Sequence, residues 1–153
     1  MLETSLRGHF AQEWENFNKK NRIKTVTLFF IDSIESYSQE DGSPGYLRTK
    51  FESKLAHHLR ANIEKFSKMS GTRAQQYIGY LKATLANIED CHGGYFSKDN
   101  STKDEEVKKK VDQILRDKEA LISFGDEAIP NTLRFVFSKW TLREGWDAPN
   151  VFQ

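Results

Sequence analysis

Residues 142–149, Leu-Arg-Glu-Gly-Trp-Asp-Ala-Pro, place a glycine among charged side chains. Gly145 lies two residues after a basic residue, Arg143, and two residues before an acidic one, Asp147. A backbone without Cβ can approach a phosphate or a sugar closely, and a carboxylate can accept a hydrogen bond from a ribose hydroxyl. The alternative is a tight turn between two strands, with glycine at a positive φ and proline as the stop. The spacing alone leaves both interpretations open.

Further polar residues follow two apolar segments. Asp32 and Ser33 come directly after residues 23–31, and Ser138 comes directly after residues 133–137. In open α/β sheets, ligands bind at the carboxyl ends of the strands. A serine at such an end can hydrogen-bond a phosphate of a nucleic-acid backbone. These three residues are therefore candidate contacts for a ligand.

Several common catalytic patterns are absent from the sequence. The phosphate loop G-x-x-x-x-G-K-[ST], the dinucleotide loop G-x-G-x-x-G and the nucleophile turn G-x-S-x-G do not occur. The histidines show no metal-ligand spacing. His57 and His58 are neighbours in a predicted helix, so their side chains point about 100° apart. We expect one to be partly buried, the other to be exposed, and no metal to be bound.

The composition predicts a globular, polar chain without a bulk nucleic-acid footprint. Its 153 residues fit one domain, and 23 basic residues nearly balance 22 acidic ones. Any nucleic-acid site must therefore be local. Cys91 is the only cysteine, which excludes an internal disulfide and fits a reducing compartment. A thiol nucleophile or metal ligand there has no supporting second cysteine. No apolar run approaches the roughly 18 residues of a membrane span, and the first residues lack the core of a signal peptide, so we expect a cytoplasmic protein.

Hydrophobic periodicity predicts alternating helices and strands. We expect helices over 3–20, 47–68, 73–89 and 104–123, and strands over 23–31, 91–97 and 133–137. The four apolar residues that end the segment 23–31 predict a strand end buried on both faces. Residues 37–46, 98–103 and 125–131 are predicted loops, and residues 151–152 begin a further strand. This alternation predicts the α/β class with a parallel sheet of about three strands plus that short segment.

The pattern F-x-x-S-x-x-x-L-R-E-G-W-D-x-P-N-V-F-Q, which ends the chain, resembles motif V of the restriction subunit of type III restriction enzymes. These enzymes are superfamily 2 helicase-like DNA translocases. The pattern is also similar to L-R-E-G-x-D-x-P of the nucleotide-excision-repair helicase and, more loosely, to R-G-x-D of DEAD-box proteins. Residues 23–37 resemble the motif IV strand, and residues 92–97 and 114–124 resemble the strand and helix that precede motif V.

The resemblance implies the second RecA-like domain of such a motor. It predicts a parallel sheet flanked by helices over residues 1–153, incomplete at the C-terminus, with a helical insert after the first strand at about 38–90 that packs on the domain. In these motors ATP binds between two RecA-like domains. The first supplies the phosphate loop and a Mg²⁺ carboxylate, and the second supplies motif V and an arginine finger in motif VI. With only motifs IV and V present, we expect no catalytic residue in this chain and no ATP or Mg²⁺ bound by it alone.

The resemblance also assigns roles and partners. The full-length enzyme would be an ATP-dependent type III site-specific deoxyribonuclease that cleaves foreign unmodified DNA, with ATP and Mg²⁺ as cofactors and a methyltransferase subunit that reads the DNA sequence. Two alternatives stay open: the second motor domain of another superfamily 2 DNA helicase, and a stand-alone α/β interaction module. The expected nucleotide-facing residues are Arg143, Glu144, Gly145 and Asp147, and the expected DNA-backbone contacts are Ser138, Asp32 and Ser33.

Overall fold

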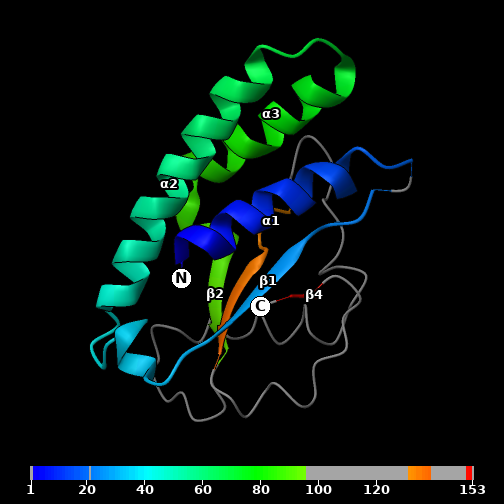
Figure 1. The fold of residues 1–153 in the computed structure, drawn as a ribbon. Helices are drawn as coiled ribbons and strands as arrows, with labels where there is room; N and C mark the ends of the chain where they lie inside the picture. The colour runs from blue at the N-terminus through cyan, green and yellow to red at the C-terminus, as the bar shows by residue number, and fades with distance from the viewer. Residues whose placement is uncertain (1, 21, 96–130, 139–150, 153) are drawn as a thin grey trace.

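The computed structural model describes residues 2–20, 22–95, 131–138 and 151–152 (Figure 1). Within them lie three α-helices, two short 3₁₀ segments and four strands. In chain order these are α1 (Leu2–Phe17), β1 (Val26–Phe30), η1 (Ile34–Ser36), α2 (Tyr46–Ser67), α3 (Thr72–Ala86), η2 (Ile88–Cys91), β2 (His92–Tyr95), β3 (Phe135–Ser138) and β4 (Val151–Phe152).

The strands form one parallel sheet in the order β2-β3-β1-β4. β1 pairs with β3 from Thr27↔Phe135 to Phe30↔Ser138, and β2 ends level with them because Tyr95 also pairs with Ser138. β4 pairs only with the first two residues of β1. The α/β class and the parallel sheet predicted from sequence are therefore confirmed.

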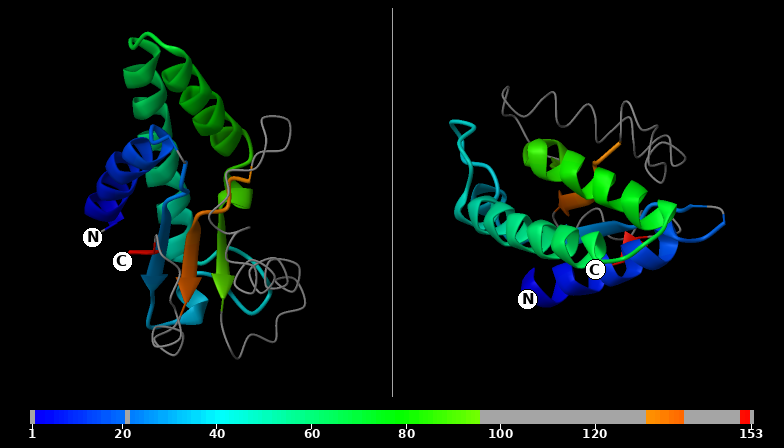
Figure 2. Two further views of the ribbon diagram at one scale, coloured as in Figure 1. Left: turned by 90° about the vertical axis from the view of Figure 1, so that its right-hand side faces the viewer. Right: turned by 90° about the horizontal axis from the view of Figure 1, so that it is seen from above.

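The helices follow the predicted apolar periodicity. α1 buries Leu6, Phe10 and Phe17 on one side, and α2 buries Phe51, Leu55, Leu59 and Phe66. Two further residues of the predicted α2 stripe, His58 and Ile63, are only partly buried. Gly71 separates α2 from α3 and has a φ of 113°, a left-handed value that glycine adopts without strain. Figures 1 and 2 show α2 and α3 as a hairpin that extends beyond the amino ends of the strands.

Helices and sheet share one hydrophobic core. The ring of Phe51 on α2 lies 5.2 Å from that of Phe135, 5.0 Å from that of Phe137 and 5.7 Å from that of Phe29. These aromatic contacts join the hairpin to the sheet, and Tyr77 and Leu81 of α3 belong to the same core. The segment after the first strand therefore packs on the sheet, as expected. The assignment of about 38–90 as an insert stays a prediction.

Some expected boundaries and burials are wrong. β1 begins at Val26 rather than at residue 23, and Phe29 and Phe30 near its end are only partly buried. Among the described residues, β4 pairs with β1 only at Val26 and Thr27. The last residues of β1 therefore have a described neighbouring strand, β3, on one side only. α3 ends at Ala86 and gives way to η2, so the predicted helix 73–89 is too long. The predicted helix 104–123 and loops 98–103 and 125–130 lie outside the described residues.

None of the helices in the described part of the chain is both long enough and apolar enough to cross a lipid bilayer.

Candidate functional site

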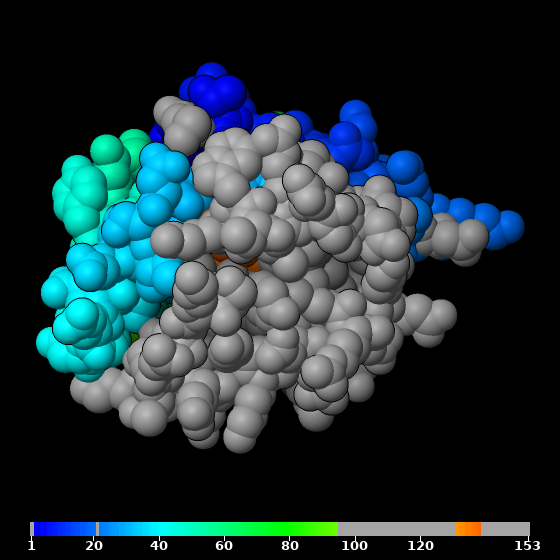
Figure 3. All heavy atoms as spheres, turned by 90° about the horizontal axis from the view of Figure 1, so that it is seen from below, coloured from blue at the N-terminus to red at the C-terminus, as the bar shows by residue number. Residues whose placement is uncertain are grey.

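The carboxyl edge of the sheet brings the three predicted backbone contacts together. Phe30 and Ser138, the last residues of β1 and β3, pair in register, and the Ile31 amide donates a 2.8 Å hydrogen bond to the Ser138 carbonyl. Asp32 and Ser33 follow at once, so they lie at the same edge as Ser138. Figure 3 views the molecule from below, the end toward which the strands run, with the segment after β1 in cyan. The placement matches the expectation, and the DNA-backbone role stays a prediction.

The three residues differ in what they offer a ligand. Asp32 and Ser33 are exposed, whereas the Ser138 side chain is 1% exposed. A carboxylate is an acceptor and repels a phosphate, so Asp32 is a poor phosphate ligand through its side chain. The Ser33 hydroxyl can donate, whereas the Ser33 carbonyl accepts hydrogen bonds from Ser36 Oγ at 2.6 Å and from the Ser36 amide at 3.3 Å. Of these three residues, Ser33 therefore has the side chain best suited to a phosphate.

The loop after β1 is folded tightly against η1. The Gly45 amide donates to the Tyr37 carbonyl at 2.9 Å, and a Cβ on Gly45 would lie 2.2 Å from the Ser36 carbonyl oxygen. Only glycine fits so close a backbone approach. Asp41 accepts hydrogen bonds from the Ser43 amide at 2.9 Å and its hydroxyl at 2.5 Å. These contacts hold the chain that leaves the carboxyl edge in one conformation.

A series of hydrogen bonds between side chains links this loop to α2 and β2. Tyr37 Oη lies 2.6 Å from His92 Nδ1, and His92 Nε2 lies 2.8 Å from Glu52 Oε1. The Glu52 oxygen also accepts from Arg48 Nε at 3.3 Å. Because the carboxylate only accepts, the His92 Nε2 proton points to Glu52. That hydrogen bond, the electrostatic interaction with the His92 ring and the Arg48 contact together lower the pKa of Glu52 against the effect of burial.

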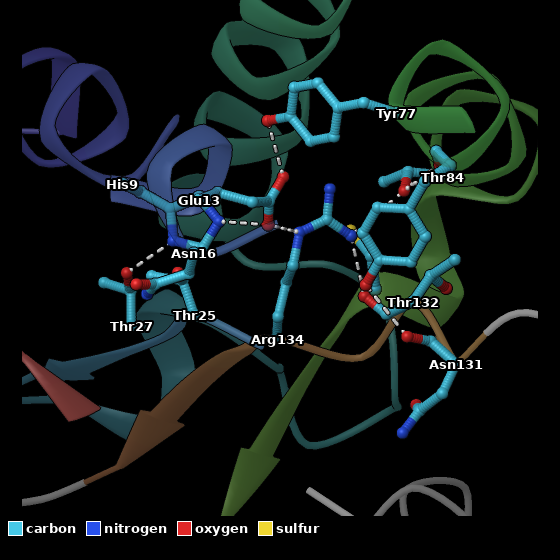
Figure 4. Close-up of polar contacts among 12 residues, drawn as sticks. His9, Glu13, Asn16, Thr25, Thr27, Tyr77, Thr84, Asn131, Thr132 and Arg134 are labelled. Carbon is cyan, nitrogen blue, oxygen red and sulfur yellow. Dashed lines mark hydrogen bonds and ion pairs between the residues drawn. The ribbon is translucent and has the colours of Figure 1, made fainter. Parts of the chain in front are cut away.

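A second polar cluster is buried between α1, α3 and the amino ends of β1 and β3 (Figure 4). Glu13 lies at its centre, with Arg134 Nε 2.6 Å and His9 Nε2 2.9 Å from Oε2, and the Tyr77 hydroxyl donating to Oε1 at 3.0 Å. The side chains of Glu13, His9 and Arg134 are all 0% exposed. His9 Nδ1 lies 2.8 Å from the Thr27 hydroxyl on β1. The cluster therefore ties α1 and α3 to two strands of the sheet.

Burial and charge fix the protonation states in this cluster. Burial alone would raise the pKa of Glu13, but the Arg134 charge and the His9 contact outweigh it and lower that pKa. Burial lowers the pKa of His9, so the ring is neutral at pH 7 and its contact with Glu13 is a hydrogen bond rather than an ion pair. The Nε2–H then donates to Glu13, and the Thr27 hydroxyl donates to Nδ1. Burial raises the pKa of Tyr77, so its hydroxyl keeps its proton.

The cluster holds more donors than acceptors. Arg134 Nη1 donates to Thr84 Oγ1 at 3.0 Å and to the Thr132 carbonyl at 2.9 Å. Its Nε contacts Glu13 as an ion pair without the direction of a good hydrogen bond, and its Nη2 has no hydrogen-bond partner among the described residues. Lys24 Nζ, also buried, has none there either. Burial and the Arg134 charge lower the pKa of Lys24 well below its ordinary value.

Sequence reasoning missed both polar clusters. One signal was available for the second: Glu13 lies three residues after Phe10 and four before Phe17, on the apolar side of α1. Arg134 likewise interrupts an apolar strand segment. A charge at a position that must be buried predicts a buried partner. For Tyr37, Glu52 and His92, which lie far apart in the sequence, no such signal exists.

The remaining candidates were placed as follows. Cys91 is buried, and burial raises the pKa of its thiol to about 12, so it is no nucleophile. His57 is exposed and His58 partly buried, as expected. The described residues contain no group of three potential metal ligands. The four expected nucleotide-facing residues, Arg143, Glu144, Gly145 and Asp147, lie outside the described residues.

Three curated proteins are similar to the whole chain or nearly so. The Res subunit of the type III restriction-modification enzyme EcoPI from Escherichia phage P1 is 44% identical over 153 residues, 100% of this chain and 15% of the relative. The Res subunit of EcoP15I from Escherichia coli is 45% identical over the same share of both chains. The Res subunit of StyLTI from Salmonella typhimurium is 42% identical over 164 residues, 99% of this chain and 16% of the relative.

No protein-family model matches the chain, and no solved structure matches it significantly. The chain spans about 15% of the length of the curated relatives. These three homologues, which match the chain over its length, are all Res subunits of type III restriction-modification enzymes.

Proposed function

We propose that this chain is part of the ATP-dependent DNA translocase motor of a type III restriction endonuclease, within its second RecA-like domain. The observation that carries the proposal is 42–45% identity to three Res subunits along the chain. The longer enzyme would cleave foreign DNA that lacks the protective modification. Similarity that covers 99–100% of the chain favours this function over that of a stand-alone interaction module.

The parallel sheet supports the proposal because a RecA-like domain places its ligand contacts at the carboxyl ends of parallel strands. Asp32, Ser33 and Ser138 share that edge. We assign the DNA-backbone contact chiefly to the exposed Ser33 hydroxyl, with Asp32 beside it at the same edge and Ser138 ending the strand that leads to residues 142–149. Contacts of this kind position DNA without reading its sequence.

ATP and Mg²⁺ would be bound mainly by another domain of the longer enzyme, because this sequence has no phosphate loop. When bound, ATP supplies the phosphoryl group whose transfer to water drives movement along DNA. In this chain, Gly145 would let the backbone approach the nucleotide, and Asp147 would accept a hydrogen bond from a ribose hydroxyl. Arg143 and Glu144 would couple the nucleotide to the DNA contacts at the carboxyl edge of the sheet. The chain alone should not hydrolyse ATP.

The DNA sequence would be read by a separate modification subunit of the same system. A motor track needs a few backbone contacts, which agrees with a net charge of only +1 in this chain.

The test is Asp147→Ala in the longer enzyme assembled with its modification subunit. Loss of one hydrogen bond to a charged group costs about 1.5–3 kcal/mol, so ATP-dependent DNA cleavage should fall about 10- to 100-fold. Glu40→Ala is the matched control, because Glu40 is an exposed carboxylate. Wild-type rates of DNA cleavage and DNA-stimulated ATP hydrolysis in Asp147→Ala would refute the nucleotide-facing role.

A further inference from the structure

The basic residues of the chain are unevenly distributed. Six of its 23 basic residues, but only Glu64 of its 22 acidic residues, occur in the short segments 18–22 and 64–73. The rest of the chain is therefore net acidic. We call these six residues the basic end: Lys19, Lys20, Arg22, Lys65, Lys68 and Arg73.

The fold brings the two segments together. Arg73 Nη1 at the start of α3 donates to the Phe17 carbonyl at the end of α1, a distance of 3.2 Å. Arg22 hydrogen-bonds Gln76 of α3, and its guanidinium lies 4.3 Å from the centre of the Phe17 ring. Figure 2 shows the end of α1 below the turn that joins α2 and α3 in the left view, and beneath it in the view from above.

The lysines of the basic end are available to a ligand. Lys19, Lys20, Lys65 and Lys68 are all exposed. Lys68 pairs with Glu64 only at 4.0 Å, with both side chains at least 75% exposed, a contact that holds neither firmly. Lysines near the end of α2 also suit the helix macrodipole, whereas Lys19 and Lys20 lie two and three residues past the end of α1.

We propose that the basic end is a second DNA-backbone site, separate from the carboxyl edge of the sheet. Its ligand is the phosphate backbone of duplex DNA, held without sequence preference. Lysine is depleted in protein–protein interfaces. Clusters of lysine neutralise DNA phosphates, and the cations condensed on the DNA are released when they bind. The chemistry therefore favours a nucleic-acid backbone over an acidic protein surface. Only the choice of DNA rests on the proposed function.

The basic end would let the motor bind DNA whether or not ATP is bound. α2 and α3 extend past the amino ends of the strands (Figure 2). Ser33 follows the carboxyl end of β1, at the opposite edge of the sheet. Two separated contacts on one domain could grip two places along a duplex. Affinity at the basic end should be strongly dependent on salt, because its four exposed lysines act as point charges.

The test measures binding of a fluorescent 30-base-pair duplex to the 153-residue chain by fluorescence anisotropy, without ATP, across a salt series. The test variant replaces Lys19, Lys20, Lys65 and Lys68 by Ala. The control variant replaces four exposed basic residues outside the basic end, Arg7, Lys50, Arg60 and Lys82, by Ala. Both variants remove the same charge, and circular dichroism checks that both stay folded.

The magnitude of the slope of log K against log salt should fall by about 3.6 in the test variant, because each of the four lost phosphate contacts contributes about 0.9. Binding at low salt should weaken at least about tenfold, and the control variant should keep most of the wild-type slope. Equal losses in both variants, wild-type binding by the test variant, or no binding by the wild type at 50 mM salt would overturn the proposal. So would poly-glutamate binding that duplex DNA cannot displace, which would indicate an acidic protein partner. The assay uses no ATP and no cleavage, so failure of the Asp147 test would leave its result standing.

Discussion

Glu13→Gln should destabilise the chain strongly, although glutamine keeps the shape of the side chain. Glu13 is fully buried and is contacted by Arg134 at 2.6 Å, His9 at 2.9 Å and Tyr77 at 3.0 Å. Glutamine keeps the shape but removes the charge, and its amide turns two hydrogens toward groups that are themselves donors. Arg134 would then be a buried cation without a counter-charge.

The size of the effect follows from that charge. Breaking a buried ion pair by removing one partner costs about 3–5 kcal/mol, which is a large share of the about 5–15 kcal/mol that stabilises a typical domain. With a urea m-value of about 2 kcal/mol/M, the unfolding midpoint should fall by about 2 M. Glu3→Gln is the matched control on the same helix. Glu3 pairs with His58 and Lys54 but is 44% exposed, so its loss should cost far less stability than the loss of Glu13.

Urea unfolding followed by circular dichroism measures both variants. A loss below about 1 kcal/mol for Glu13→Gln, or equal losses for Glu13→Gln and Glu3→Gln, would refute the reasoning. Adding Arg134→Gln removes the stranded cation, so the double variant should be less destabilised than the sum of the two single changes by at least about 2 kcal/mol. Strict additivity would show that the two side chains do not interact.

Three further outcomes are expected from the same unfolding measurement. Lys24→Met should stabilise the chain by about 1–2 kcal/mol at pH 7, because the buried amine has no hydrogen-bond partner among the described residues. Lys82→Met, at an exposed position, should change the stability by less than about 0.5 kcal/mol. A clear loss of stability in Lys24→Met would show that the amine is hydrogen-bonded. Gly45→Ala should lower the stability by about 1–3 kcal/mol, because the new Cβ would lie 2.2 Å from the Ser36 carbonyl oxygen. Gly8→Ala, with open space around it on α1, should raise the stability by up to about 1 kcal/mol. An unchanged stability of Gly45→Ala would contradict the close approach of the two backbone segments. Stability should fall as the pH drops below about 6.5, because the pKa of His9 is lower in the folded state and the unfolded state takes up the proton first. His9→Gln should make the stability depend less steeply on pH in this range. An unchanged pH dependence in His9→Gln would assign it to other groups.

Local patterns in the sequence predicted much of the fold. The apolar stripes at spacings of three and four placed α1, α2 and α3 within a few residues, because an amphipathic helix carries its periodicity in its own sequence. Alternation of helices with strands predicted the parallel sheet. The strand ends were less accurate, because the partial exposure of Phe29 and Phe30 depends on how far the neighbouring strand extends.

The candidate site divides in the same way. Asp32, Ser33 and Ser138 could be predicted to share an edge, because the carboxyl ends of parallel strands always meet at one edge. The exposure of Ser33 and the burial of Ser138 came only from the structure. The basic end was likewise invisible in a net charge of +1, since its two segments lie more than 40 residues apart.

The sequence by itself determined which residues are apolar, where helices and strands form, and which motif ends the chain. Only the tertiary structure decided which charges meet. Glu13 on α1 and Arg134 before β3 are 121 positions apart, and no local rule couples them. They pair because folding buries both, and a buried charge is tolerated only beside its opposite.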